Sequence, residues 1–423
     1  MKRIFGLITI CSVLAFPVLA AIPADFGGNG IAWENDYGQY YVNTNNPDLR
    51  IDWNNQYFAV PGEGGQYADE NAAVIAWGSG SLVKPVSATN IEVVKKTLLS
   101  LDNIRETKEK PTSPPGQDKK NGSKEKYTAT GALGLLATGA KYAVVIGICD
   151  YPGTDYDLCE SDGDSLHMYK ALITLYGYDP ANIYLFKDMG EDAEYGGTYF
   201  EEDTTDDIPT ITAQKPTREN ILGAINTIKT TITSDDEVVF FFSGHGAKGN
   251  ADDGDAEDTD EAIVVHDSDG EMDADGYSDL DFIWDGELRS WFDGFGTTRI
   301  AFVFDSCRAG GMNDVATDID GVVINGRVIS MATEETRSAY VYSTAGEDVD
   351  GDGVKDGEGV FTRLFANEGM LQGLADGYNQ LETTDDNVAV EEAFDYAKKN
   401  IPRSLKGRQK PVISDNFTDD LLL

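Results

Sequence analysis

The chain is poor in basic residues. Its 423 residues include 33 lysines and arginines against 74 aspartates and glutamates, which gives a formal net charge of -41. A nucleic-acid binder needs a basic face to neutralise phosphates, so this imbalance disfavours that class of protein. Basic peptides and divalent cations are the partners that such a charge favours. The apolar and aromatic content is ordinary for a globular protein.

Long hydrophobic runs are also missing. An apolar run at residues 4–16 follows Lys2 and Arg3, a pattern typical of a cleaved secretory signal over residues 1–20. This run is too short to predict a membrane span, and no other segment of the sequence suits one. We therefore predict a secreted or periplasmic protein.

Histidine and cysteine are scarce, with three and four residues in the chain. His167 lies in a helical pattern and His266 in an acidic loop, so only His245 follows an apolar run and is flanked by glycines. Cys11 falls in the predicted signal, which leaves an odd number of cysteines. At least one should therefore stay a free thiol even in an oxidising compartment, and we expect it to be Cys307.

Two apolar runs end in polar motifs. Residues 238–242 precede Ser-Gly-His-Gly, and residues 300–304 precede Asp-Ser-Cys. Each run is typical of a strand buried on both faces of a parallel sheet, and open α/β sheets bind ligands at the carboxyl edge. The sequence thus predicts that His245 and Cys307 meet there as a catalytic dyad. The alternative, a chance strand end and a small buried hydrophobe, does not explain why both lie at strand ends.

The rest of the chain divides by composition. Residues 21–103 contain short alternating runs and are predicted to form a β-rich N-terminal segment or propeptide without chemistry. Residues 104–139 include a lysine-dense stretch with proline and glycine, which predicts a flexible linker. Residues 140–423 alternate strands with helices, which predicts an α/β domain with a mainly parallel sheet covered by helices on both faces. The predicted strands span residues 142–148, 182–186, 238–242, 300–304 and 339–343, and the helices residues 164–176, 217–232, 361–374 and 390–400.

The histidine and cysteine motifs, in this order within an α/β domain, resemble the caspase-like cysteine peptidases, most closely a bacterial or archaeal metacaspase. Residues 151–162 and 359–364 resemble further landmarks of that family. The resemblance implies a three-layer caspase-like fold and cysteine endopeptidase activity. Cys307 would attack as the thiolate, His245 would protonate the leaving amine, and the N–H groups of Gly246 and Cys307 would bind the oxyanion. The sequence indicates no third, acidic member.

The resemblance also implies an acidic pocket for the substrate residue before the cut. The matching positions are Cys159, Asp162, Ser243 and Asp305. Buried aspartates are costly unless they meet a cation, so they imply an arginine or lysine guest, and a carboxylate pair suits either one. The alternatives are a helix N-cap for Asp162 and a turn-stabilising role for Asp305.

Acidic loops without histidine suit a hard cation such as Ca²⁺. The resemblance implies calcium dependence, with ligands at Asp260, Asp285 and Asp314. Gly286 stands where the family has a second adjacent aspartate, so one ligand is missing or is supplied elsewhere, with Glu287 as a candidate.

A second loop matches part of a calcium-loop pattern but lacks the glutamate expected at its twelfth place. Its carboxylates are Asp348, Asp350, Asp352 and Asp356. The acidic run at residues 252–258 matches no ligand pattern, so we interpret it as a solvated face that keeps the protein soluble.

An enzyme that cuts after basic residues can cut itself. We therefore predict a zymogen with calcium-dependent self-cleavage within residues 106–126, at Arg327 or at Arg337. Its expected partners are peptide or protein substrates with arginine or lysine before the cut. Two alternatives stay open: a catalytically weak, calcium-binding interaction protein with this fold, and a legumain-like or clostripain-like peptidase. The oligomeric state does not follow from the sequence.

Overall fold

A computed structural model of the chain describes a β-rich N-terminal unit and a larger α/β unit. Backbone contacts assign residues 1–62 and 66–83 to the first unit, and residues 63–65 and 84–423 to the second. In the first unit only the strands are described. In the second, the described residues are 86, 88–99, 127–149, 151, 158, 160–187, 213–253, 259–266, 280–318, 320–342 and 357–423. The predicted signal peptide lies outside the described residues.

The N-terminal unit contains one antiparallel sheet, with its strands in the order of the chain. The strands are β1 (Trp33–Asp36), β2 (Tyr40–Asn43), β3 (Arg50–Asn54), β4 (Tyr57–Ala59) and β5 (Gln66–Tyr67). This arrangement agrees with the β-rich segment expected from the sequence.

The α/β unit is built on a six-stranded sheet with the order β18-β15-β14-β10-β8-β9. Its strands are β8 (Lys141–Gly147), β9 (Ile183–Lys187), β10 (Glu237–Ser243), β14 (Ile300–Asp305), β15 (Arg327–Met331) and β18 (Val412–Asp415). All neighbours pair in parallel except the edge strand β18, which pairs antiparallel with β15. The predicted fold class, a mainly parallel α/β sheet, is confirmed.

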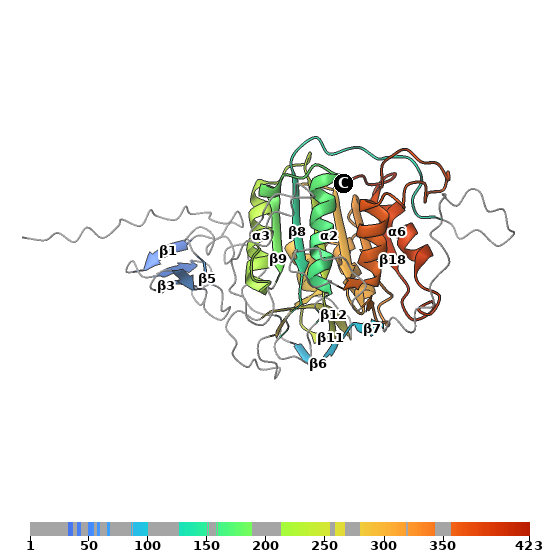
Figure 1. The fold of residues 1–423 in the computed structure, drawn as a ribbon. Helices are drawn as coiled ribbons and strands as arrows, with labels where there is room; N and C mark the ends of the chain where they lie inside the picture. Colours follow the sequence, from blue (N-terminus) through green and yellow to red (C-terminus); the bar gives the residue numbers. More distant parts are fainter. Residues whose placement is uncertain are drawn as a thin grey trace, which may run out of the picture. The chain divides into compact units, whose positions relative to one another are not determined.

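Helices cover both faces of this sheet. On one face, α2 (Ser161–Thr174) and α6 (Val390–Asn400) pack with the π-helical turn η5 (Arg363–Leu371) over a buried apolar core (Figure 1). On the other face, the ring of Phe292, at the end of α4 (Asp285–Trp291), packs against Phe240 of the sheet. Helix α3 (Arg218–Thr231) contacts α4 and begins at Thr217, whose hydroxyl caps the helix as predicted. Shorter helical turns are η3 (Pro180–Asn182), η4 (Ala309–Ala316) and α5 (Val360–Thr362).

Two small sheets lie at one end of the large one (Figure 1). The first contains β6 (Ala88–Val94), β11 (Gly246–Ala251), β12 (Asp260–His266) and β13 (Leu280–Trp284), and the second β7 (Thr97–Leu99), β16 (Tyr340–Tyr342) and β17 (Glu358–Gly359). Strand β6 pairs antiparallel with β11, and β7 pairs in parallel with β16. Residues 88–99 therefore belong to the α/β unit, although the sequence analysis assigned them to the N-terminal segment.

The structure corrects three other expectations. The predicted strand at residues 339–343 lies in a small sheet as β16, and the large sheet instead contains β15, which the sequence analysis missed. His266 ends β12 rather than lying in a loop. Residues 127–139 are not all linker, because Thr130 and Gly131 donate backbone hydrogen bonds to the Asp420 carboxylate of the domain. No helix in the described part of the chain is long and apolar enough to cross a membrane.

Candidate active site

Three neighbouring strands of the large sheet end in register. Ser243 at the end of β10 lies opposite Asp305 at the end of β14 and opposite Gly147 at the end of β8. His245 lies two residues beyond the end of β10, and Cys307 lies two residues beyond the end of β14. The predicted convergence of the two strand-end motifs at one edge of the sheet therefore occurs.

The side chains of His245 and Cys307 contact the two polar groups of one peptide unit, which joins Lys95 to Lys96. The Cys307 thiol donates to the Lys95 carbonyl oxygen at 3.3 Å, and the Lys96 N–H donates to Nδ1 of His245 at 3.2 Å. Cys307 is 1% exposed and His245 is 2% exposed. The sulfhydryl and the imidazole therefore lie against one backbone amide, the arrangement that a peptide-hydrolysing dyad would need.

Burial controls the state of the Cys307 thiol. It raises the pKa of Cys307 to about 11, and a hydrogen bond from the Ala339 N–H only partly offsets it. The thiolate is the nucleophilic form, so the side chain is a weak nucleophile in this arrangement. Among the described cysteines, Cys307 is free and Cys149 forms a disulfide, so the predicted free thiol is confirmed. Cys159, which the sequence analysis placed in the pocket, lies outside the described residues.

Gly246 brings the backbone of β11 against the nucleophile. A Cβ at this position would lie 2.1 Å from the Cys307 carbonyl oxygen, so only glycine permits the approach. The backbones of the two residues expected to bind an oxyanion are therefore adjacent.

Tyr151 supports His245 and was not predicted to do so. Its ring stacks on the imidazole with centroids 4.7 Å apart and planes 26° apart. Its hydroxyl accepts a hydrogen bond from the His245 N–H at 2.9 Å and donates to the Val264 carbonyl at 3.2 Å. A Cβ on Gly244 would lie 2.4 Å from this hydroxyl, so the glycine is required. Tyr151 thus fixes the histidine through both its backbone and its ring.

Removal of the Tyr151 ring should weaken the dyad. The stacked ring fixes the plane of the imidazole. We expect Tyr151→Leu to lower kcat/KM about 10-fold, because the imidazole loses this support. Tyr151→Phe keeps the ring and should lower kcat/KM by a smaller factor. Equal losses in the two variants would contradict this role.

An acidic subsite formed by Asp164, Ser243 and Asp305 lies beside the dyad. Asp305 accepts hydrogen bonds from the Thr362 N–H at 2.9 Å and hydroxyl at 2.8 Å. Asp164 accepts from the Ser243 hydroxyl at 2.6 Å and from the Gly359 N–H at 2.9 Å. Burial raises the pKa of Asp164 well above its usual value, and the Lys96 ammonium opposes this effect. Two buried carboxylates at such a site require a cation.

That cation is Lys96, in the segment between β6 and β7. Its ammonium lies 3.1 Å from Asp305, 3.9 Å from Asp164 and within hydrogen-bond distance of the Ser243 hydroxyl, at 2.9 Å. The side chains of Lys96 and both aspartates are fully buried. The acidic subsite thus holds a lysine side chain from the same chain. The sequence analysis found no chemistry in this segment.

Asp162 is not part of the acidic subsite. Its carboxylate lies 3.4 Å from the Lys187 ammonium and is partly exposed. Asp164, two residues later on α2, occupies the position that the sequence analysis gave to Asp162. Asp162 does not cap the helix either, because the N-cap position is Glu160.

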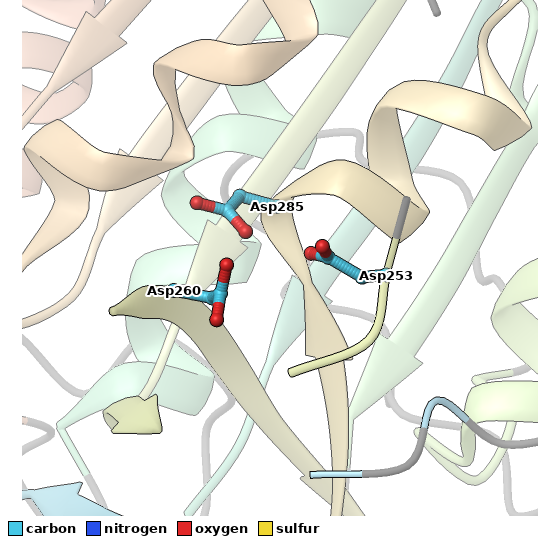
Figure 2. A group of neighbouring side chains, drawn as sticks. All are labelled: Asp253, Asp260 and Asp285. Atoms are coloured by element: carbon cyan, nitrogen blue, oxygen red, sulfur yellow. The ribbon is translucent and has the colours of Figure 1, made fainter. Parts of the chain in front are cut away.

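Three carboxylates gather near the start of α4: those of Asp253, Asp260 and Asp285 (Figure 2). One oxygen from each lies within 4.8 Å of the others. The Gly286 N–H donates to Asp253 and to Asp285, at 3.0 Å in each case. Burial, together with repulsion from Asp253 and Asp314, raises the pKa of Asp285 well above its usual value. An all-oxygen donor set of this kind fits Ca²⁺.

Asp253 supplies the carboxylate that the sequence analysis found missing at Gly286. A Cβ on Gly286 would lie 2.7 Å from the Asp253 carboxylate, so an aspartate at 286 would collide with it. Glu287, the candidate substitute, instead pairs with Arg218, and Asp314 pairs with Arg289 at 2.7 Å. Asp260 and Asp285 are brought together as expected, and Asp253, interpreted from sequence as solvated, joins them. The second predicted loop, with Asp348, Asp350, Asp352 and Asp356, lies outside the described residues.

Comparisons with known proteins agree with these features. A family model described as the caspase domain matches residues 140–422. Metacaspase-4 of Arabidopsis thaliana is 32% identical over 181 residues, which cover 42% of this chain and 35% of that protein. Metacaspase-7 of the same plant is 29% identical over 182 residues, 42% of this chain and 37% of the relative. Metacaspase-1 of Kluyveromyces lactis is 31% identical over 121 residues, 29% of this chain and 23% of the relative. The matches thus span less than half the length of these relatives.

Proposed function

Because this chain belongs to the caspase-domain family of cysteine peptidases, we propose that it is a cysteine endopeptidase that cuts after lysine or arginine. The observation that carries the specificity is the buried Lys96 ammonium beside Asp305, Asp164 and the Ser243 hydroxyl. An ammonium desolvated among carboxylates and hydrogen-bond acceptors has the chemistry of a basic substrate side chain in its subsite. A guanidinium fits the same acceptors, so both basic residues are substrates.

The proposed mechanism uses the two buried side chains at the strand ends. Cys307, as the thiolate, attacks the carbonyl carbon of the basic residue, and His245 protonates the leaving amine. The backbone N–H groups of Gly246 and Cys307, two residues whose backbones are in close contact, bind the oxyanion. Water then hydrolyses the acyl-enzyme. Tyr151 keeps the imidazole in place through its stack and hydrogen bond.

A panel of peptides that end in Arg, Lys, Asn or Asp before a reporter tests the specificity. Each is assayed with and without a chelator, next to the Cys307→Ala chain. The proposal expects release from the Arg and Lys peptides only, and none in the variant. Cleavage after Asn would instead support the legumain-like alternative. The absence of any cleavage, also by a folded Lys96→Glu chain whose acidic subsite no longer holds the Lys96 ammonium, would support an interaction protein that keeps only the fold.

We propose that calcium binds Asp253, Asp260 and Asp285. A bound divalent cation would neutralise three carboxylates that repel each other in its absence. Asp260 begins β12, whose partner β11 starts at Gly246 beside the dyad, so the calcium site and the catalytic residues share one small sheet.

Calcium should raise the melting temperature of the chain, because a ligand that binds only the folded state stabilises it. Asp253→Asn should weaken calcium binding, measured by titration calorimetry, by about 10-fold or more. Asp252→Asn is the matched control, because Asp252 is the exposed neighbour and should leave the affinity unchanged. Equal affinities for the two variants would exclude this ligand set.

Self-processing and export are part of the same proposal. Residues 106–126 lie outside the described residues and stay a candidate cleavage segment. Arg327 is a poor site, because it is buried in β15 and its guanidinium donates to the Phe292 carbonyl at 2.7 Å. Arg337 is partly exposed and stays a candidate. The disulfide at Cys149 supports an exported, oxidised protein.

A further inference from the structure

Arg308 follows the candidate nucleophile directly and has an unusual backbone conformation. It is the N-cap residue of the helical turn η4, and its φ of 58° and ψ of 18° lie in the left-handed region. Residues with a Cβ rarely adopt this conformation, and it persists only where neighbouring contacts hold it. The direction in which the chain leaves Cys307 therefore depends on what holds Arg308.

Backbone hydrogen bonds hold the turn on one side. The Arg308 N–H donates to the Arg337 carbonyl at 2.9 Å, and the Gly311 N–H donates to the Arg308 carbonyl at 2.9 Å. The segment that contains Arg337 also contacts the thiol, because the Ala339 N–H donates to Sγ of Cys307 at 3.2 Å. The left-handed turn and this segment thus form one connected backbone unit around the sulfur.

A buried carboxylate holds the turn on its other side. The Glu261 side chain is 2% exposed, and one of its oxygens lies 3.6 Å from a guanidinium nitrogen of Arg308. A buried carboxylate is costly unless it meets a cation, and Arg308 provides one. A Cβ on Gly311 would lie 2.1 Å from the Glu261 carboxylate, so the glycine lets η4 pack directly on it.

Strand β12, which carries Glu261, also holds the histidine of the dyad. It pairs antiparallel with β11 on one side and with β13 on the other, and all of its residues are buried. The Val264 N–H of the same strand donates to the His245 carbonyl at 3.1 Å. One rigid strand therefore contacts the backbone of His245 directly and the turn after Cys307 through the Glu261–Arg308 ion pair.

We propose that Glu261 and Arg308 are positioning residues, whose ion pair fixes the left-handed turn after Cys307 and so keeps the thiol in register with His245. The inference rests on the proposed function, in which Cys307 is the nucleophile. Loss of either charge removes this contact from a buried site and releases the turn. A small displacement of a reacting group costs a large factor in rate, so the effect belongs to the chemical step.

Neutral variants test the proposal by the kinetics of a Lys peptide. In the Lys96→Glu chain with calcium present, Glu261→Gln and Arg308→Gln are each expected to lower kcat about 10²-fold. KM should stay within about threefold, because the substrate side chain binds in the acidic subsite. The double variant should lose about the same factor as either single one, whereas independent effects would multiply to about 10⁴-fold. Multiplied losses, or a raised KM with normal kcat, would overturn the proposal.

Two further changes at Arg308 separate its charge from its backbone conformation. Arg308→Gly accepts a φ of 58° without strain but lacks the guanidinium, so it should lose as much kcat as Arg308→Gln. Arg308→Lys keeps a cation and should retain kcat within about 10-fold of the parent chain. An unchanged kcat in Arg308→Gly would show that the turn alone matters, and would overturn the role of the ion pair.

Arg289→Gln is the matched control, because it makes the same side-chain change in an ion pair at the far end of η4. There Arg289 lies 2.7 Å from Asp314, whose side chain is 23% exposed. Water can replace the arginine at such a carboxylate, so kcat should stay within about threefold of the parent. A loss equal to that of Arg308→Gln would show that any ion pair on η4 has this effect, which would overturn the assignment.

Alkylation of Cys307 tests the pair without a substrate. The Cys307 side chain is buried, and release of the turn should admit a reagent. In the otherwise wild-type chain, we expect iodoacetamide to modify Cys307 at least about fivefold faster in Glu261→Gln and Arg308→Gln than in the wild type, with Arg289→Gln within about twofold of it. The Arg308 side chain is 19% exposed, so Arg308→Gln carries the test if Glu261→Gln does not fold. Equal rates would overturn the proposal.

The positioning role and the proposed function fail in different ways. If alkylation follows the expected pattern but the parent chain cuts no peptide, the ion pair positions the thiol and the peptidase function fails. If the parent chain cuts Lys peptides and the alkylation rates are equal, the function stands and the positioning role is overturned.

Discussion

Replacement of Cys307 by alanine is expected to lower hydrolysis of basic peptides by at least about 10⁴-fold, because loss of a covalent nucleophile leaves only binding and oxyanion stabilisation. Its thiol is the free one among the described cysteines and lies against a backbone carbonyl. Circular dichroism and the melting temperature show whether the variant is folded. Residual activity within 10-fold of the wild type would exclude Cys307 as the nucleophile.

The pH dependence of Cys307 gives a second measurement on the same residue. Burial disfavours the thiolate and raises the pKa of this side chain to about 11. Below that pH the thiol form predominates, so alkylation of the wild type with chelator present should rise about 10-fold per pH unit from pH 7 to 10. A plateau below pH 8 would show that the thiol is already ionised before any activation.

In the Lys96→Glu chain, whose acidic subsite no longer holds the Lys96 ammonium, replacement of Asp305 by asparagine is expected to lower kcat/KM for a Lys peptide by about 10²- to 10⁴-fold. Breaking a buried ion pair costs about 3 to 5 kcal/mol, and about 1.4 kcal/mol corresponds to 10-fold in rate. Asparagine keeps an oxygen for the Thr362 hydrogen bonds, so the fold around the site should persist. Asp164→Asn should have a similar effect, because Asp164 shares the same ammonium.

Asp162→Asn is the matched control for this prediction, because Asp162 lies two residues from Asp164 and pairs with Lys187 instead. It should change kcat/KM for the Lys peptide by less than about threefold. A peptide with norleucine in place of lysine provides the second control, since it lacks the charge and should lose little on Asp305→Asn. If Asp162→Asn had the larger effect, the acidic subsite described here would be wrong.

The central strands and the dyad could be predicted because their signals are local. An uninterrupted apolar run such as residues 238–242 identifies a buried strand, and the polar residue that ends it identifies the carboxyl edge. The sequence analysis missed strand β15 because the polar side chains of Arg327 and Ser330, although buried, interrupt its apolar pattern.

The residues that complete the site could not be predicted, because their roles depend on tertiary contacts. Asp162 and Asp164 both lie in the first turn of α2, and only the packing of that helix on the sheet determines which one reaches Ser243. Asp253 lies far from Gly286 in the sequence, and the fold brings its carboxylate to the glycine N–H. Lys96 precedes the domain motifs in the chain, and its role appears only where β6 pairs with β11.

Covalent trapping tests the specificity and the nucleophile together. In the proposed enzyme, Cys307 attacks the carbonyl of a residue whose basic side chain lies between Asp164 and Asp305. The Lys96→Glu chain is treated with peptidyl acyloxymethyl ketones that carry lysine or aspartate at the reactive end, and the adducts are mapped by mass spectrometry. We expect the lysyl compound to modify Cys307 at least about 100-fold faster than the aspartyl compound, and Asp305→Asn to remove that advantage. Modification of another residue, or equal rates for the two compounds, would contradict the proposed enzyme.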